Sequence, residues 1–132
     1  MALKWKDKYS LNHDVIDSQH KEWFKKVDDL MAACRQRKGN EKIGELLDFV
    51  VDYTVKHFST EEDIQKSCGY PDIEKHKGIH NAFVKKVRDV KDEFDDRDGL
   101  PINKMVEVNS MLSKWLINHV TGIDQDIKEY LD

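Results

Sequence analysis

Apolar side chains recur every three or four residues along four long segments of the chain, which is the spacing of one face of an α-helix. The segments with this spacing extend over residues 16–34, 43–64, 73–94 and 105–119. The residues between them are Gly39-Asn40, Gly69-Tyr70-Pro71 and Asp98-Gly99-Leu100-Pro101. We expect Gly39-Asn40 to end the first helix, Asp72 to cap the third, and Pro101 to lie in the first turn of the fourth. Residues 121–131 continue the fourth helix or begin a short one.

The short connections determine how these helices are arranged. Only a few residues separate consecutive segments, so neighbouring helices run antiparallel. We therefore predict an all-α protein, an up-down-up-down antiparallel four-helix bundle. A chain of 132 residues is the size of one domain, so the bundle extends over residues 1–132. Residues 1–15 form an irregular N-terminal arm anchored by Trp5, Tyr9 and Leu11.

Composition narrows the classes of function. Charged residues make up 36% of the chain, but both signs are interspersed and the net charge is −4, so the basic stripe of a nucleic-acid-binding protein is missing. The apolar runs are too short to span a bilayer, and the first residues lack the apolar core of a signal peptide. We expect a cytoplasmic protein with no nucleic-acid or membrane partner, and a monomer in preference to an oligomer. Cys34 and Cys68 are predicted to be two buried free thiols in preference to a disulfide.

Five of the six histidines lie on the apolar stripes, where polar side chains need partners. These five are His20, His57, His76, His80 and His119, and the inward-facing carboxylate of Glu61 lies among them. In an antiparallel bundle the beginnings of the first and third helices meet the ends of the second and fourth. The five imidazoles and the carboxylate therefore converge on one layer of the core. The sixth histidine, His13, is predicted to lie on the surface of the arm.

The spacing of these residues suits a metal site. Two pairs are four residues apart, and their side chains meet on one helix face: His57 with Glu61, and His76 with His80. His119 and Asp124 are five residues apart, which is out of phase for an α-helix, but Gly122 between them permits a π-type bulge. Glu62 points about 100° away from its neighbour Glu61, so we expect it to support a ligand or to face solvent, and not to bind metal.

The donor types restrict the metal. Imidazole and carboxylate suit iron, manganese, cobalt or zinc, whereas calcium and magnesium prefer oxygen donors. The five histidines, Glu61 and Asp124 make seven candidate ligands. A structural zinc site uses about four. Seven ligands instead suit two metal ions that share bridging carboxylates, with one coordination position left vacant. The ferritin-like di-iron pattern needs Glu three residues before His, where this chain has Thr54, Ile73, Lys77 and Leu116. The His-Glu-x-x-His motif of metalloproteases is also absent.

Taken together, these residues resemble the hemerythrin family, in its single-domain bacterial form. The resemblance covers nearly the whole chain and begins at Trp5. Its motifs are Ile16-Asp17-Ser18-Gln19-His20-Lys21, His57-Phe58-Ser59-Thr60-Glu61-Glu62, His76-Lys77-Gly78-Ile79-His80 and Trp115-Leu116-Ile117-Asn118-His119-Val120-Thr121-Gly122-Ile123-Asp124. All seven ligand positions of the family are filled.

The resemblance implies a cofactor of two iron ions. One ion, coordinatively full, is held by His76, His80 and His119. The other, which keeps an open position for dioxygen, is held by His20 and His57. The bridging groups are Glu61, Asp124 and an oxo or hydroxo group.

Reversible binding also implies a dry wall beside the open position, because water or protons reaching the bound dioxygen would release it and leave an oxidised site. The candidate wall residues are Trp23, Phe58, Trp115, Val120 and Thr121. The first four also suit ordinary core packing. Thr121 stands where the family often has a larger apolar residue. If its hydroxyl faces the open iron, we expect faster autoxidation than in relatives with Leu there.

The implied function is reversible dioxygen binding at a non-haem di-iron centre, for oxygen storage, delivery or sensing, without enzymatic turnover. The same ligands suit two alternatives. One is a di-iron redox enzyme with peroxidase or nitric-oxide-reducing activity, and the other is an iron-sensing or interaction module. The lack of an obvious acid–base pair disfavours the enzyme, and the lack of a second domain disfavours direct signal output.

Overall fold

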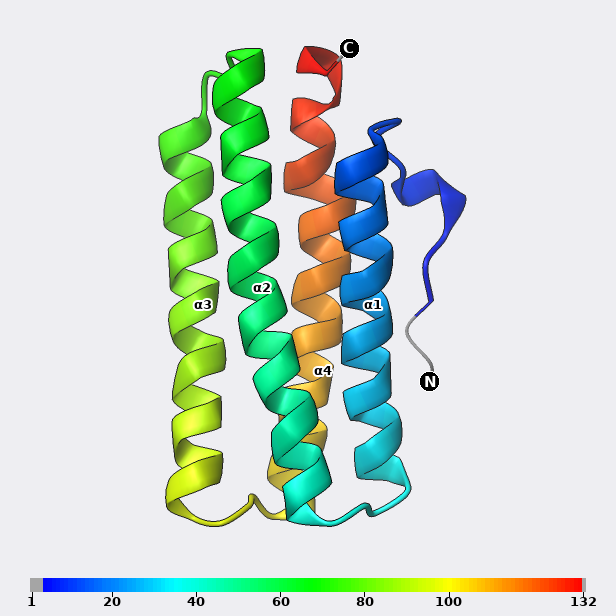
Figure 1. Cartoon of the computed structure of the whole chain (residues 1–132), viewed down its shortest axis with the longest axis vertical. Coiled ribbons are helices and arrows are strands. Elements are labelled where there is room, and N and C mark those ends of the chain that lie inside the picture. Colours follow the sequence, from blue (N-terminus) through cyan, green and yellow to red (C-terminus); the bar gives the residue numbers. More distant parts are fainter. Residues whose placement is uncertain (1–3, 132) are drawn as a thin grey trace.

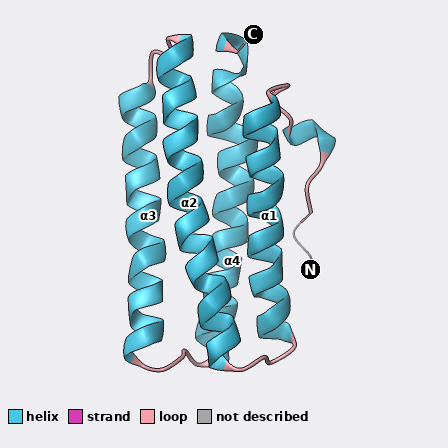
Figure 2. Ribbon diagram, viewed as in Figure 1, coloured by secondary structure: helices cyan, strands magenta, loops and turns pink. Residues whose placement is uncertain are grey.

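The computed structural model describes residues 4–131, apart from the side chains of Ile123 and Asp124, and it confirms the four-helix bundle. The helices are α1 (Asp14–Arg35), α2 (Asn40–Cys68), α3 (Ile73–Asp96) and α4 (Ile102–Asn118). α2 packs against α1 and α3, and α1 also packs against α4. Consecutive helices run antiparallel, so the beginnings of α1 and α3 lie at the same end of the bundle as the ends of α2 and α4 (Figure 1). Residues 4–131 contain no strand (Figure 2).

The apolar stripes meet along the bundle axis and form its core. Leu30 of α1 and Leu47 of α2 are fully buried, as are Val87 of α3 and Leu112 of α4 to within a few per cent. Burying such a side chain contributes about 1.5–3 kcal/mol relative to leaving it in water. Among the described Asp, Glu, Lys and Arg residues, only Glu61 is buried. No described helix is both long and apolar enough to cross a membrane.

The predicted end of the first helix was wrong. α1 ends at Arg35, and Gly39 and Asn40 instead begin the next helix, as its N-cap and first residue. Arg37 takes a left-handed conformation with φ of 54°, which turns the chain before Gly39 is reached. Asn40 then donates a hydrogen bond from Nδ2 to the backbone oxygen of Asp98 at 2.6 Å. This bond joins the two loops at the end of the bundle remote from the histidines.

Two other predicted helix starts need adjustment. Asp72 does stand at the N-cap of α3, but its side chain makes no capping hydrogen bond there. Pro101 occupies the N-cap of α4, immediately before the helix and not within its first turn. The fixed φ of proline suits both positions.

The N-terminal arm lies along the outside of α1 (Figure 1) and contains a short 3₁₀ helix, Asp7–Tyr9. Tyr9 and Leu11 are buried, as predicted, and Trp5 is partly buried. The Asp17 carboxylate accepts a hydrogen bond from the backbone N–H of Leu11 at 2.9 Å. His13 is half-buried at the N-cap of α1, where its Nδ1 accepts from the backbone N–H of Ile16 at 3.3 Å.

The chain continues beyond α4 without turning back. A π-helix, His119–Ile123, leads into a 3₁₀ helix, Asp124–Tyr130. Of the two predicted options for residues 121–131, the structure therefore shows continuation, with a change of helix type. Cys34 and Cys68 are both free thiols, but only Cys34 is buried, and Cys68 is partly exposed. Burial raises the pKa of Cys34 despite opposing effects of Asn109 and Arg35.

Two glycines should respond oppositely to alanine. Gly69 ends α2 with φ of 74°, a left-handed conformation, whereas Gly78 lies within α3 with open space around its missing Cβ. We expect Gly69→Ala to lower the free energy of unfolding by about 1–2 kcal/mol, and Gly78→Ala to raise it by about 0.5–1 kcal/mol. Urea denaturation of the metal-free protein measures both, and changes of the same sign would contradict this account of the backbone.

Candidate metal centre

Six of the seven predicted ligands come together at one end of the bundle. Three of the four α-helices and the π-helix after α4 contribute them: His20 from α1, His57 and Glu61 from α2, His76 and His80 from α3, and His119 from the start of the π-helix. All six are buried, with at most 2% of their surface exposed. They form two groups that could each hold a metal ion, and Glu61 belongs to both.

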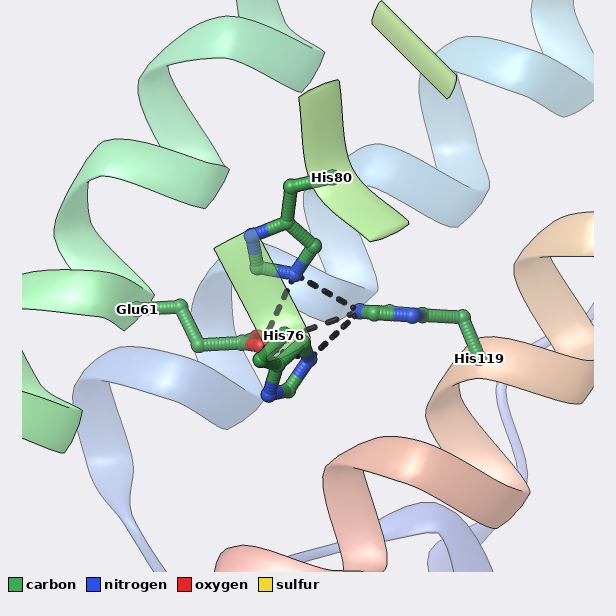
Figure 3. Close-up of side chains that lie close together, drawn as sticks. All are labelled: Glu61, His76, His80 and His119. Atoms are coloured by element: carbon green, nitrogen blue, oxygen red, sulfur yellow. Dashed lines mark hydrogen bonds and ion pairs between the residues drawn. The ribbon is translucent and has the colours of Figure 1, made fainter. Parts of the chain in front are cut away.

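The larger group surrounds one oxygen of Glu61 (Figure 3). Oε1 lies 3.2 Å from Nε2 of His76, 3.4 Å from Nε2 of His80 and 3.7 Å from Nε2 of His119. The Nε2 atoms of His80 and His119 are 3.2 Å apart, and those of His76 and His119 are 3.5 Å apart. Three imidazole nitrogens and one carboxylate oxygen thus face a common centre.

The smaller group lies at the other oxygen of the same carboxylate. Oε2 of Glu61 is 2.9 Å from Nε2 of His57 and 3.5 Å from Nε2 of His20. The rings of these two histidines are in contact, with centroids 4.6 Å apart. The carboxylate therefore has three imidazoles at one oxygen and two at the other.

The predicted bulge after His119 is confirmed. The π-helix extends over His119–Ile123, so one extra residue is accommodated in the turn that includes Gly122. The backbone of Asp124 follows directly, at the histidine end of the bundle. The side chain of Asp124 lies outside the described part of the structure, and its role as a ligand stays a prediction.

Three of the imidazoles are oriented by hydrogen bonds at their other ring nitrogen. Nδ1 of His57 lies 2.9 Å from Oε1 of Gln19, and Nδ1 of His80 lies 2.7 Å from Oε2 of Glu62. Both partners are oxygen acceptors, so Nδ1 carries the hydrogen in each ring. A third contact joins Nδ1 of His76 to the side-chain amide of Gln65 at 2.5 Å.

These hydrogen bonds make the cluster suitable for a cation. With hydrogen on Nδ1, a neutral ring directs a bare lone pair from Nε2 towards the centre. The Nε2 atoms of His57 and His80 therefore point their lone pairs at the oxygens of Glu61, over 2.9 and 3.4 Å. Electron pairs so placed repel one another unless protons or a metal ion lie between them. In this buried site a metal ion would satisfy them without several charged imidazoles, which are costly to bury.

Imidazoles also control the ionisation of Glu61. Where protons lie between the imidazoles and Glu61, complete burial on its own would raise the pKa of this carboxyl group, but the hydrogen bonds that the imidazoles then donate outweigh burial and hold the pKa well below its usual range. The imidazoles responsible are those of His119, His20, His57 and His80. The carboxylate is thus ionised, as a metal ligand must be.

Four of the five predicted wall residues lie against the cluster or are buried beside it. Phe58 stacks on His80 with ring centroids 3.7 Å apart, and Trp115 stacks on His119 at 4.5 Å. Trp23 contacts His57 at 5.0 Å, and Val120 is fully buried. Phe83, which was not among the predicted wall residues, stacks on Trp115 with ring centroids 3.7 Å apart.

The placement of Thr121 was predicted wrongly. Thr121 is exposed, and its hydroxyl donates to the backbone oxygen of Ile117 at 2.7 Å. Val120 is buried, whereas Thr121, two positions after the inward-facing His119, lies on the opposite side of the helix. Thr121 therefore does not line the site, and the expected effect of its hydroxyl on autoxidation loses its basis.

The sequence analysis also missed the two glutamines that orient histidines. Gln65 could have been found, because it lies four residues after Glu61 and so on the same helix face. The stripe was instead extended to Ile64, which is only partly buried, whereas Gln65 is fully buried. Gln19 gives no such signal, because its contact with His57 joins two helices.

A further hydrogen bond supports the wall and is open to test. The indole N–H of Trp23 donates to the Thr54 hydroxyl at 3.1 Å, and that hydroxyl donates to the backbone oxygen of Val50 at 2.6 Å. Thr54→Val leaves the buried indole N–H without this acceptor, so we expect the free energy of unfolding to fall by about 1–3 kcal/mol. Thr121→Val is the matched control, since it removes a similar hydroxyl at the surface, and should change stability by less than about 0.5 kcal/mol. Equal losses in the two variants would contradict the assignment.

Comparison with known proteins agrees with this site. Residues 11–131 match the family described as the Hemerythrin HHE cation binding domain. The chain is 36% identical to a bacteriohemerythrin of Stenotrophomonas maltophilia over 123 residues, which are 93% of this chain and 77% of that protein. It is 30% identical to a myohemerythrin of Theromyzon tessulatum, over 92% of this chain and 87% of that protein.

Solved structures show the same likeness. A crystal structure of wild-type hemerythrin superposes with a TM-score of 0.85 at 27% identity, covering 99% of this chain and 98% of that one. A crystal structure of a hemerythrin mutant gives the same TM-score at 28% identity, with the same coverage. The fold, the buried histidine clusters and the sequence match together show that this chain belongs to the hemerythrin family.

Proposed function

We propose that this protein binds dioxygen reversibly at a non-haem di-iron centre built from the cluster around Glu61. The observation that carries the proposal is the asymmetry of that cluster, with three imidazoles at one carboxylate oxygen and two at the other. The bacteriohemerythrins and myohemerythrin that match this chain support iron as the metal. An ion with fewer protein ligands keeps a coordination position for a small molecule.

In this proposal His76, His80 and His119 hold one iron ion, and His20 and His57 hold the other. The carboxylates of Glu61 and Asp124 would be shared by both ions. When bound, the two ions would supply the electrons and the open coordination position that dioxygen binding requires.

The chain's own residues would keep the site dry and fixed. Trp23 and Phe58 cover His57 and His80, so water cannot approach these rings from the core side. Gln19 and Glu62 hold the same rings from the other edge and fix which nitrogen faces the centre. The site is thus organised to bind a small apolar molecule and return it unchanged.

The proposal is tested by iron content and absorbance. We expect two iron ions per chain, and an absorption band in the visible range that appears when the reduced protein meets air and disappears when oxygen is removed. Glu61→Ala should lose both ions, because this carboxylate faces both groups. His13→Ala removes the histidine at the N-cap of α1, which belongs to neither group, and should keep the iron content of the unchanged protein.

The same experiment distinguishes the enzyme alternative. Irreversible conversion to an oxidised spectrum on exposure to air, with turnover of added peroxide or nitric oxide, would favour a di-iron redox enzyme. Binding of zinc in place of iron, or of no metal, would contradict both functions. Whether the bound oxygen is stored, delivered or sensed is tested by a different measurement, the oxygen affinity compared with the concentration in the cell.

A further inference from the structure

The hydrogen-bond partners of the cluster histidines are chemically unequal. His57 and His76 meet the neutral amides of Gln19 and Gln65, but His80 meets the carboxylate of Glu62, with 2.7 Å between Nδ1 and Oε2. Hydrogen bonds to a charged acceptor are shorter and roughly twice as strong as neutral ones. At His76 the nearest Gln65 atom is the amide nitrogen, which donates to Nδ1. Of the two contacts in which Nδ1 donates to an oxygen, the one from His80 to Glu62 is therefore the stronger, and at 2.7 Å it is shorter than the 2.9 Å bond from His57 to Gln19.

The position of His80 is fixed from two directions. Phe58 lies flat against its ring, with centroids 3.7 Å apart and planes 3° from parallel, while Glu62 holds its edge. Glu62 itself is largely buried, with 21% of its side chain exposed in a groove between α2 and α3. Asp63 lines the same groove but is exposed and makes no described contact with a histidine.

We infer that Glu62 is a positioning residue which acts through His80 to tighten the grip of the three-histidine group on its metal ion. A carboxylate that accepts the Nδ1 hydrogen fixes the ring with Nε2 towards the metal and makes Nε2 a stronger donor. Loss of such a partner typically weakens metal binding about 10–100-fold.

The effect is confined to one of the two ions. Nε2 of His80 faces Oε1 of Glu61, the oxygen of the three-histidine group. The two-histidine group faces Oε2, and its orienting partner at His57 is the neutral amide of Gln19. Removal of Glu62 should therefore speed release of the ion in the three-histidine group and leave release of the other ion unchanged. This inference rests on the proposed two-ion centre.

Release of cobalt(II) tests the inference without oxygen chemistry. Each variant is loaded with cobalt(II) to two ions per chain, and its visible absorption is followed after a chelator is added in excess. We expect Glu62→Ala to release one ion per chain about 10–100-fold faster than the unchanged protein, with the other ion released at the original rate. Asp63→Asn, which removes a neighbouring charge from the same groove, should behave as the unchanged protein.

A conservative variant distinguishes the loss of the Glu62 charge from a general loss of folded structure. Glu62→Gln keeps an oxygen that can accept the Nδ1 hydrogen, so it should accelerate release of the same ion by a smaller factor, with an unchanged helical circular dichroism spectrum. Unaltered release in Glu62→Ala, or equal acceleration of both ions, would overturn the inference and leave the two-ion centre standing. Failure of the unchanged protein to take up two cobalt ions would overturn the proposed centre itself.

Discussion

A fully buried carboxylate in the middle of a helical bundle is the constraint to which the rest of the site is adapted. Moving an ionised group from water into a protein interior costs roughly several kcal/mol, even after the protein relaxes around it. This desolvation penalty applies in full to Glu61, because none of its surface is exposed. Imidazoles from α1, α2, α3 and the π-helix after α4 compensate it. One side chain therefore has contacts to imidazoles from α1, α2, α3 and the π-helix at this end of the bundle.

Helical periodicity was enough to predict the bundle and most of the cluster. The histidines could be located because a polar residue on an apolar stripe is conspicuous, and because short loops bring alternate helix ends together. The bulge at Gly122 was predictable for a related reason, since His119 and Asp124 are out of phase in a regular helix. These features depend only on spacing along the chain.

What the sequence did not reveal depends on contacts between helices. The pairing of Gln19 with His57 joins α1 to α2, and that of Glu62 with His80 joins α2 to α3. No periodic pattern encodes such a pairing. Thr121 was predicted wrongly for another reason, because its place in the wall came from the family resemblance. Two positions after His119, a helical side chain points to the opposite side of the helix, and Thr121 is exposed there.

The aromatic wall has a consequence for how the protein can be observed. Each of the three tryptophans lies against a cluster histidine, since Trp115 stacks on His119, Trp23 contacts His57, and Trp5 is 6.3 Å from His20. A transition-metal ion bound to these rings would accept excitation energy from every indole in the chain. The intrinsic tryptophan fluorescence of this protein should therefore fall as metal binds, and no tryptophan lies far enough from the cluster to add an unchanged background.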